Sequence, residues 1–175
     1  MSIHLARKTA EELVARLGFE KPPIDVDKVA RSLGLRVVRG NLGAGISGLL
    51  VRNADGAFVC VQETDSRARQ RFTLGHEIGH HFLRHQFEAG AHVHVDRGNF
   101  ISQRGPRASA GVDPKEIDAN QFAAALLMPS RMLRKRATEI VGDGPLHDGD
   151  VAALADEFDV SEQAMTIRLT ALGIL

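Results

Sequence analysis

Residues 71–83 are Arg71-Phe72-Thr73-Leu74-Gly75-His76-Glu77-Ile78-Gly79-His80-His81-Phe82-Leu83, and they contain the pattern H-E-x-x-H. At about 100° per residue the apolar positions of this stretch fall on one arc, which predicts an amphipathic helix that buries the arc against the core. The arc consists of Phe72, Gly75, Gly79, Phe82 and Leu83. The same helix is expected to begin near residue 66 and to end near residue 85.

The pattern places three chemically useful side chains on this helix. His76 and His80 are one turn apart, so their imidazoles point the same way and can share one small cation. The Glu77 side chain is expected to project from a neighbouring part of the helix surface, toward solvent, in the position of the general base of a metallohydrolase. Gly75 and Gly79 each weaken a helix by about 1 kcal/mol relative to alanine, so another element is expected to cross closely there. An inert helix with histidines at the edge of the core is the alternative interpretation.

A catalytic zinc ion usually has three protein ligands and one open position, so a third ligand is needed. His81 and His85 would project from other faces of the same helix and are excluded. The search therefore moves to residues 114–129, where a second helix is predicted. Asp113 is its expected N-cap, Pro114 fits its first position and Pro129 ends it.

Glu116 is the first candidate for the third ligand. It lies at the edge of the apolar arc of the second helix, where an unpaired charge would be costly without a cation. Asp118, expected to point nearer to solvent, is a weaker candidate, and His92 and His94 are the remaining ones. These two histidines alternate along a short predicted strand, which also suits a second metal, a transition-state role or simple exposure. Asn120, one turn after Glu116, either orients a metal ligand or serves as a packing amide.

The rest of the first part of the chain predicts an α+β fold. Helices are expected at 5–17 and 26–33, followed by strands at 35–39, 46–52 and 57–62, the last two joined by a hairpin turn. These strands would form a small antiparallel sheet. Cys60 is the single cysteine and cannot form an internal disulfide, so it is interpreted as core filler. The chain contains no tyrosine, so an oxyanion would have to be stabilised by histidine, arginine, backbone or metal.

The end of the chain predicts a small helical lobe packed on the first domain. A hinge at Gly142-Asp143-Gly144-Pro145 divides residues 1–142 from residues 143–175. Helices at 151–158 and 161–172 have a spacing similar to helix-turn-helix. The second of them carries one arginine, Arg168, together with acidic Glu162, which argues against direct DNA binding and favours a structural or substrate-docking lobe.

Composition gives only general limits. The 22 Lys and Arg residues balance the 22 Asp and Glu residues, so no global attraction to nucleic acid or to an anionic membrane is expected. The first residues lack a signal-peptide core, and no apolar run is long enough to span a bilayer. A cytoplasmic location, with no membrane partner, is the expectation.

Residues 71–80 and 116–129 together resemble the ImmA/IrrE family of metallopeptidases, and looser similarity covers nearly the whole chain. The resemblance implies a zincin-like domain in which His76, His80 and Glu116 hold the metal and Glu77 is catalytic. In zincins the strand before the metal helix commonly lies along the cleft, which here would give residues 57–62 a free edge for the substrate.

Two functions follow from these observations. The first is a zinc endopeptidase that cleaves a helix-turn-helix (XRE-like) repressor and so relieves repression of stress-response or mobile-element genes, as characterised members of the family do. The alternative is a non-proteolytic regulator that binds a repressor or DNA and keeps a structural metal. Two imidazoles and one carboxylate would also accept manganese or iron.

Overall fold

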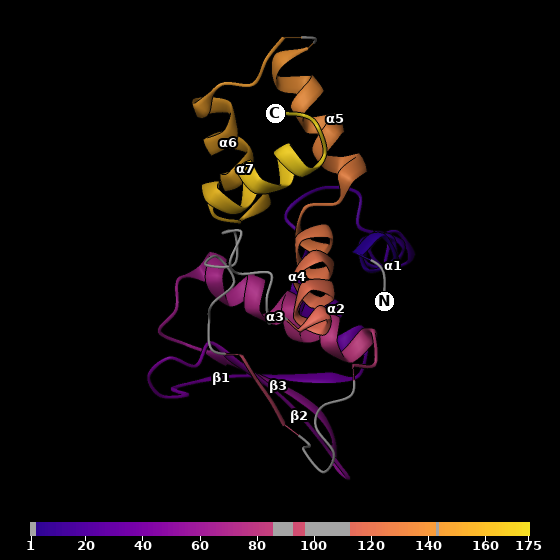
Figure 1. The fold of residues 1–175 in the computed structure, drawn as a ribbon, viewed down its shortest axis with the longest axis vertical. Coiled ribbons are helices and arrows are strands. Elements are labelled where there is room, and N and C mark those ends of the chain that lie inside the picture. Colours follow the sequence, from indigo (N-terminus) through magenta and orange to yellow (C-terminus); the bar gives the residue numbers. More distant parts are fainter. Residues whose placement is uncertain (1–2, 86–92, 97–112, 143) are drawn as a thin grey trace.

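The computed structural model describes residues 3–85, 93–96, 113–142 and 144–175. It has the expected α+β architecture, with a sheet at one end, helices stacked upon it and the C-terminal helices at the other end (Figure 1). The helices of the described part are α1 (Ile3–Arg16), α2 (Val26–Ser32), α3 (Arg67–Phe82), α4 (Pro114–Leu127), α5 (Ser130–Val141), α6 (Asp148–Phe158) and α7 (Glu162–Ala171). The strands are β1 (Leu35–Gly40), β2 (Gly48–Asn53), β3 (Gly56–Gln62) and β4 (Val93–Asp96).

The sheet is mixed, so the expectation of an antiparallel sheet is wrong for its first strand. Its strand order is β1-β3-β2-β4; β2 runs antiparallel to β3 and β4, whereas β1 runs parallel to β3. The connection from β1 to β2 leaves a gap of one strand between them, and the β2–β3 hairpin then places β3 in this gap. Because β3 is paired on both sides, it has no free edge, and the expected substrate edge at residues 57–62 is wrong.

The helix expected over the H-E-x-x-H pattern is confirmed as α3. The Ser66 hydroxyl accepts a hydrogen bond from the Arg69 backbone N–H and caps its start. The helix ends at Phe82, earlier than expected, and Arg84 adopts a left-handed conformation with φ 54°. This turn folds the chain back, so that the backbone N–H of His85 donates to the carbonyl of His80 at 3.0 Å.

The second expected helix is α4, and it crosses α3 closely. The Asp113 carboxylate caps it by accepting from the Lys115 backbone N–H. A Cβ built on Gly79 would lie 3.2 Å from Ala119 Cα, and one built on Gly75 would lie 3.4 Å from Ala123 Cβ. The predicted packing reason is therefore confirmed at Gly79, where a Cβ would press on the α4 backbone, whereas a Cβ on Gly75 would make an ordinary van der Waals contact.

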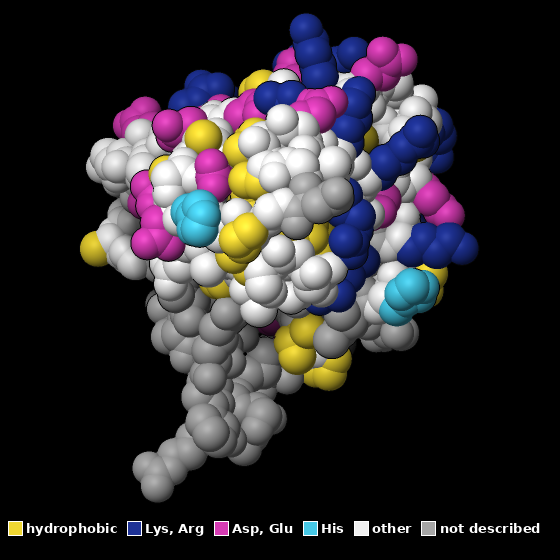
Figure 2. Space-filling view, turned by 90° about the horizontal axis from the view of Figure 1, so that it is seen from above, with side chains coloured by type: hydrophobic (Ala, Val, Ile, Leu, Met, Phe, Trp, Pro, Cys, Tyr) yellow, Lys and Arg dark blue, Asp and Glu magenta, His cyan; other side chains and the backbone are white. Residues whose placement is uncertain are grey.

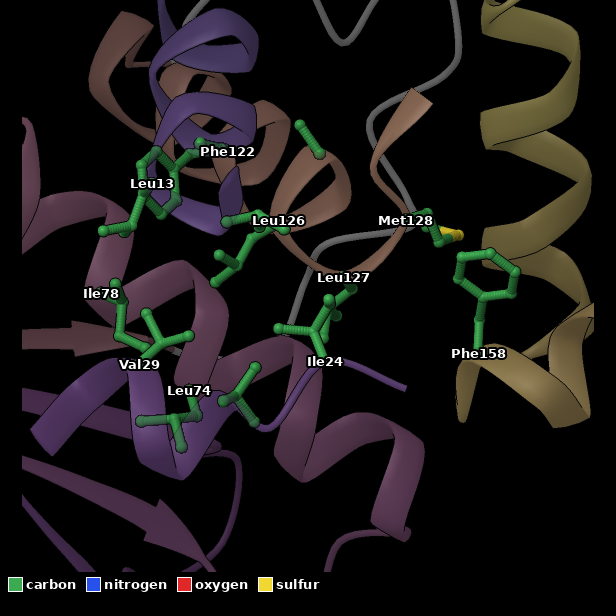
Figure 3. Packing of buried hydrophobic residues seen from close by; sticks show 14 of the residues in the cluster. Leu13, Ile24, Val29, Leu74, Ile78, Phe122, Leu126, Leu127, Met128 and Phe158 are labelled. Atoms are coloured by element: carbon green, nitrogen blue, oxygen red, sulfur yellow. The ribbon is translucent and has the colours of Figure 1, made fainter. Parts of the chain in front are cut away.

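The hydrophobic core runs without interruption from the sheet side of α3 to the C-terminal helices (Figure 3). Leu74 and Ile78 of α3 belong to the same buried cluster as Leu50 and Val59 of the sheet. At the other end of the cluster, Met128 lies near the ring of Phe158 on α6 (Figure 3). The division of the chain at residue 142 into two domains stays a prediction.

Two buried arginines fasten the C-terminal helices to the rest of the chain. Arg71 of α3 donates to the carbonyl oxygens of Asp159 at 2.9 Å and Ile24 at 3.0 Å. Arg168 of α7 donates to the Met128 carbonyl and to the Glu11 carboxylate, both at 3.0 Å. The Arg168 side chain is only 2% exposed, so it points inward rather than toward a partner.

The outer surface at the C-terminal end carries charges of both signs. Viewed from that end, Lys and Arg side chains lie among Asp and Glu side chains rather than in one basic patch (Figure 2). Part of this balance comes from ion pairs, since Arg136 of α5 pairs with Glu139 and with Glu157 of α6. Within the described residues, the structure shows no helix that is long and apolar enough to cross a membrane.

The helix crossing can be tested by adding one methyl group. Gly79→Ala is expected to lower the free energy of unfolding by about 1 kcal/mol net, since overpacking costs about 1–3 kcal/mol and the gain in helix propensity is about 1 kcal/mol. Urea denaturation of the metal-free chain measures this. Gly149→Ala is the control, because a Cβ there meets no atom within 4 Å, and it should raise stability by about 0.4–1 kcal/mol. Equal gains in both variants would contradict the close approach of α3 and α4.

Candidate metal centre

Four side chains from three elements converge beside α3. They are His76 and His80 of α3, Glu116 from the first turn of α4, and His94 of β4, and each offers one candidate ligand atom within 4.8 Å of all the others. The Nε2 atoms of His76 and His80 are 3.0 Å apart. The Glu116 carboxylate spans them, with Oε2 at 3.3 Å from His76 Nε2 and Oε1 at 3.3 Å from His80 Nε2.

The crossing of the two helices explains how Glu116 reaches the histidines. His76 and His80 are one turn apart on α3, and both are buried, at 0% and 1% exposure. Because Gly79 lies against Ala119 of α4, the first turn of α4 begins directly over the histidine pair. The structure therefore brings together the three residues that the sequence proposed as ligands.

His94 is the member of the group that sequence reasoning left among the alternatives. Its Nε2 lies 3.7 Å from Glu116 Oε1, and its ring centroid lies 4.1 Å from that of His80. The alternation of residues 92–95 predicts a strand, which the structure confirms for 93–96, whereas His92 lies outside the described residues. Only the pairing of β4 with β2, which sets His94 opposite Leu50, turns the His94 side chain toward α3.

Asp118, the other alternative ligand, is not in the group. It is 2% exposed, so the expectation that it points toward solvent is wrong. The reason is that α4 is covered on two sides, by α3 and by α1, where Arg7 donates to Gln121 at 2.8 Å. The Asp118 carboxylate instead acts on His85, whose pKa burial lowers and whose charged form Asp118 favours.

The Nδ1 atoms of the two helix histidines have partners of their own. His76 Nδ1 lies 2.9 Å from Asn120 Oδ1, and His80 Nδ1 lies 3.0 Å from His85 Nδ1. When Nδ1 of His76 donates to Asn120, the neutral ring carries no proton on Nε2, and this tautomer is the one that a metal at Nε2 needs. Sequence reasoning missed His85, because it placed this residue on the helix rather than on the turn that follows it.

Glu77 is buried, which corrects the expectation that it points toward solvent. Its side chain is 0% exposed, because β2 passes over it: a Cβ on Gly48 would overlap Thr73 and lie 3.3 Å from Glu77 Oε1. Neither carboxylate oxygen has a hydrogen-bond partner among the described residues. Burial raises the pKa of Glu77 well above its usual range, and Asp96 and Glu116 raise it further, while Arg52 opposes them.

The protonation of the group suits a cation. Burial lowers the pKa of His80 to about 3, and burial also lowers the pKa of His94, so both rings are neutral at pH 7. Burial alone would raise the pKa of Glu116, but hydrogen bonds with His76 and His80 hold it below its usual range. The neutral imidazoles can bind a metal through nitrogen, and the negative charge of the Glu116 carboxylate is one that a divalent metal would offset.

This helix, the carboxylate from a second helix and the adjoining strand have the arrangement expected of a zincin-like domain. Comparison with known families agrees, because the family described as Peptidase_M78, IrrE N-terminal-like domain, matches residues 30–170. The chain belongs to this family, which supports a metallopeptidase-like role.

One solved structure is similar in fold. It is a Mycobacterium tuberculosis transcriptional regulator, with a TM-score of 0.64 and 18% sequence identity over 95% of this chain and 46% of that chain. The present chain therefore spans somewhat less than half of the length of that protein. No curated protein matches the chain.

The third ligand can be tested by metal binding. Glu116→Gln is expected to lower zinc affinity by more than the roughly 10–100-fold that accompanies loss of a partner behind a ligand, because a direct ligand is removed. Competition with a chromogenic chelator measures the dissociation constant. Asp118→Asn, the matched control on the same helix, should bind zinc like the wild type. Loss of zinc in Asp118→Asn with full retention in Glu116→Gln would transfer the ligand role to Asp118.

The hydrogen bond behind His76 gives a second test. Asn120→Ala is expected to weaken zinc binding by about 10–100-fold, because His76 loses the partner that fixes its ring and tautomer. Gln121→Ala is the control, since Gln121 is the next residue of α4 but bonds to Arg7 instead. Equal zinc affinities for the two variants, measured by the same competition, would mean that Asn120 only packs between the helices.

Proposed function

We propose that the chain is a zinc-dependent endopeptidase in which His76, His80 and Glu116 hold the metal and Glu77 is the general base. The observation that carries this proposal is the Glu77 carboxylate, which is buried beside the metal-ligand group and has no hydrogen-bond partner in the described part of the chain. If the histidines only lined the edge of the core, the Glu77 carboxylate would not be expected to lie buried without a hydrogen-bond partner, because that burial is costly.

The chemistry is divided between the metal and the protein. Zinc at this group would polarise the peptide carbonyl and lower the pKa of a water molecule, and manganese or iron would suit the same ligands. Glu77 takes the proton from the attacking water and returns it to the leaving amine. Its burial under β2 keeps this carboxylate away from bulk solvent and holds it beside Glu116. Asn120 and His85 keep the two helix histidines in place.

The substrate backbone would pair with β4 rather than with β3. Strand β4 pairs with β2 on one side, and no described strand pairs with its other side. An extended peptide added there would run beside His94 and close to Glu77, whose Oε1 lies 4.0 Å from His94 Nε2. This position brings the scissile bond near the general base.

The substrate we propose is a helix-turn-helix repressor. The family membership supports a peptidase, and the structural relative is a transcriptional regulator, which supports a connection with gene control. Exposed side chains, rather than Arg168, would contact the repressor, since Arg168 already donates to the Met128 carbonyl and the Glu11 carboxylate. A repressor encoded beside the gene of this chain is the first substrate to try.

Replacement of the general base tests the peptidase directly. Glu77→Gln keeps size and hydrogen bonding but removes basicity, so it should cleave the repressor slower by about 10²–10⁴-fold, the usual contribution of a positioned base. Zinc content and repressor binding should match the wild type. Cleavage is followed by electrophoresis of purified repressor, and relief of repression by a reporter gene.

The reporter gene distinguishes the peptidase from the alternative, a regulator that acts by binding alone. If Glu77→Gln relieves repression fully while the repressor stays intact, the protein acts by binding and not by cleavage. The matched control is Glu63→Gln, a carboxylate at the end of β3 outside the metal-ligand group, which should leave cleavage unchanged.

A further inference from the structure

We propose that His94 is a fourth, displaceable metal ligand that keeps the centre closed until a substrate enters. The inference rests on the proposed metal site and extends it. Its basis is the placement of His94 Nε2 relative to the other three ligands, which can be compared with the geometry that zinc requires.

Distances among the ligand atoms indicate direct coordination. With bonds of about 2.0–2.1 Å, a tetrahedral zinc site places neighbouring ligand atoms about 3.3 Å apart. The observed separations are 3.0 Å between the helix histidines, 3.3 Å from each of them to Glu116, and 3.7 Å from His94 Nε2 to Glu116 Oε1. His94 therefore lies at nearly the same distance from Glu116 as the other two histidines do.

A role toward the substrate alone would place His94 differently. An imidazole that hydrogen-bonds the substrate carbonyl oxygen stands one hydrogen bond, about 2.8 Å, beyond the oxygen that faces the metal. Its nitrogen would then be well separated from the protein ligands. All four candidate atoms instead lie within 4.8 Å of one another. The separation of 3.7 Å between His94 Nε2 and Glu116 Oε1 exceeds the tetrahedral value by only about 0.4 Å.

Four protein ligands would leave no open position, as in a structural zinc site, whereas a peptidase needs one. Displacement of one ligand removes this conflict, and His94 is the one that the fold allows to leave. His76 and Glu116 lie on helices held together by the Gly79 crossing, and His80 is backed by His85. His94 comes from β4, which pairs with a strand on one side only among the described residues. A peptide that pairs with β4 would act on this strand directly.

Cobalt substitution of the full chain tests the coordination without any need for activity. Four-coordinate Co²⁺ absorbs visible light strongly, and five- or six-coordinate Co²⁺ absorbs weakly. The wild type is expected to give the strong spectrum, and His94→Ala a spectrum with shifted bands, because water replaces a nitrogen ligand. Added imidazole should restore the wild-type bands. Zinc affinity of His94→Ala should fall by at least about tenfold. Val95→Ala, on the same strand but with an exposed side chain, is the control and should match the wild type.

Displacement is tested with acetohydroxamate, a small metal chelator. If His94 occupies the fourth position at least nine-tenths of the time, acetohydroxamate should bind wild type about tenfold more weakly than His94→Ala. An unchanged cobalt spectrum and zinc affinity in His94→Ala would overturn the proposal and leave His94 facing the substrate. Equal acetohydroxamate affinity would overturn displacement. If the wild type gives the strong spectrum but does not cleave the repressor, only the peptidase function is contradicted, and His94 remains a metal ligand.

Discussion

The close crossing of α3 and α4 is the constraint on which the rest of the structure depends. A side chain at Gly79 would press on the backbone of α4 at Ala119 and push the first turn of α4 away from the histidine pair. The approach of Gly79 to Ala119 places the Glu116 carboxylate across both Nε2 atoms. Gly79, which weakens the helix locally, therefore helps to assemble the group of candidate ligands.

The same crossing buries charge, and the surrounding residues limit its cost. Glu77 is fully enclosed, and the pKa of its carboxyl is raised by burial and by Asp96 and Glu116. Arg52 of β2 opposes this effect: it donates to the carbonyl oxygens of His80 and His85 at 3.0 Å and favours the charged form of Glu77. A bound divalent cation would offset the remaining negative charge, so metal binding and folding are expected to stabilise each other.

The C-terminal helices are attached to the rest of the chain through α3, the helix that carries the histidine pair. Arg71, one turn before Gly75, reaches the carbonyl oxygens of Phe158 and Asp159 between α6 and α7 and also that of Ile24. Asp159 adopts the left-handed conformation that ends α6, and its carboxylate accepts from Arg67 of α3 at 2.7 Å. A partner that bound α6 and α7 would therefore contact elements joined directly to the helix that carries His76 and His80.

The sequence by itself determined the local elements and the chemistry of α3. Periodicity and caps predicted α3 and α4, because these signals lie within a few residues of one another. The H-E-x-x-H spacing and the edge position of Glu116 indicated three candidate ligands, and the structure brings their side chains together. The glycine pair predicted that some element crosses α3, although it could not say which one.

Tertiary structure decided everything that depends on distant parts of the chain. The burial of Glu77 requires β2 to pass over α3, and the place of His94 in the group requires β4 to pair with β2. His85 reaches His80 only because the chain turns back at Arg84. The parallel pairing of β1 with β3 depends on where a long connection crosses. Residue patterns report only local conformation and solvent exposure, whereas all of these contacts except that of His85 with His80 join segments that lie far apart in sequence.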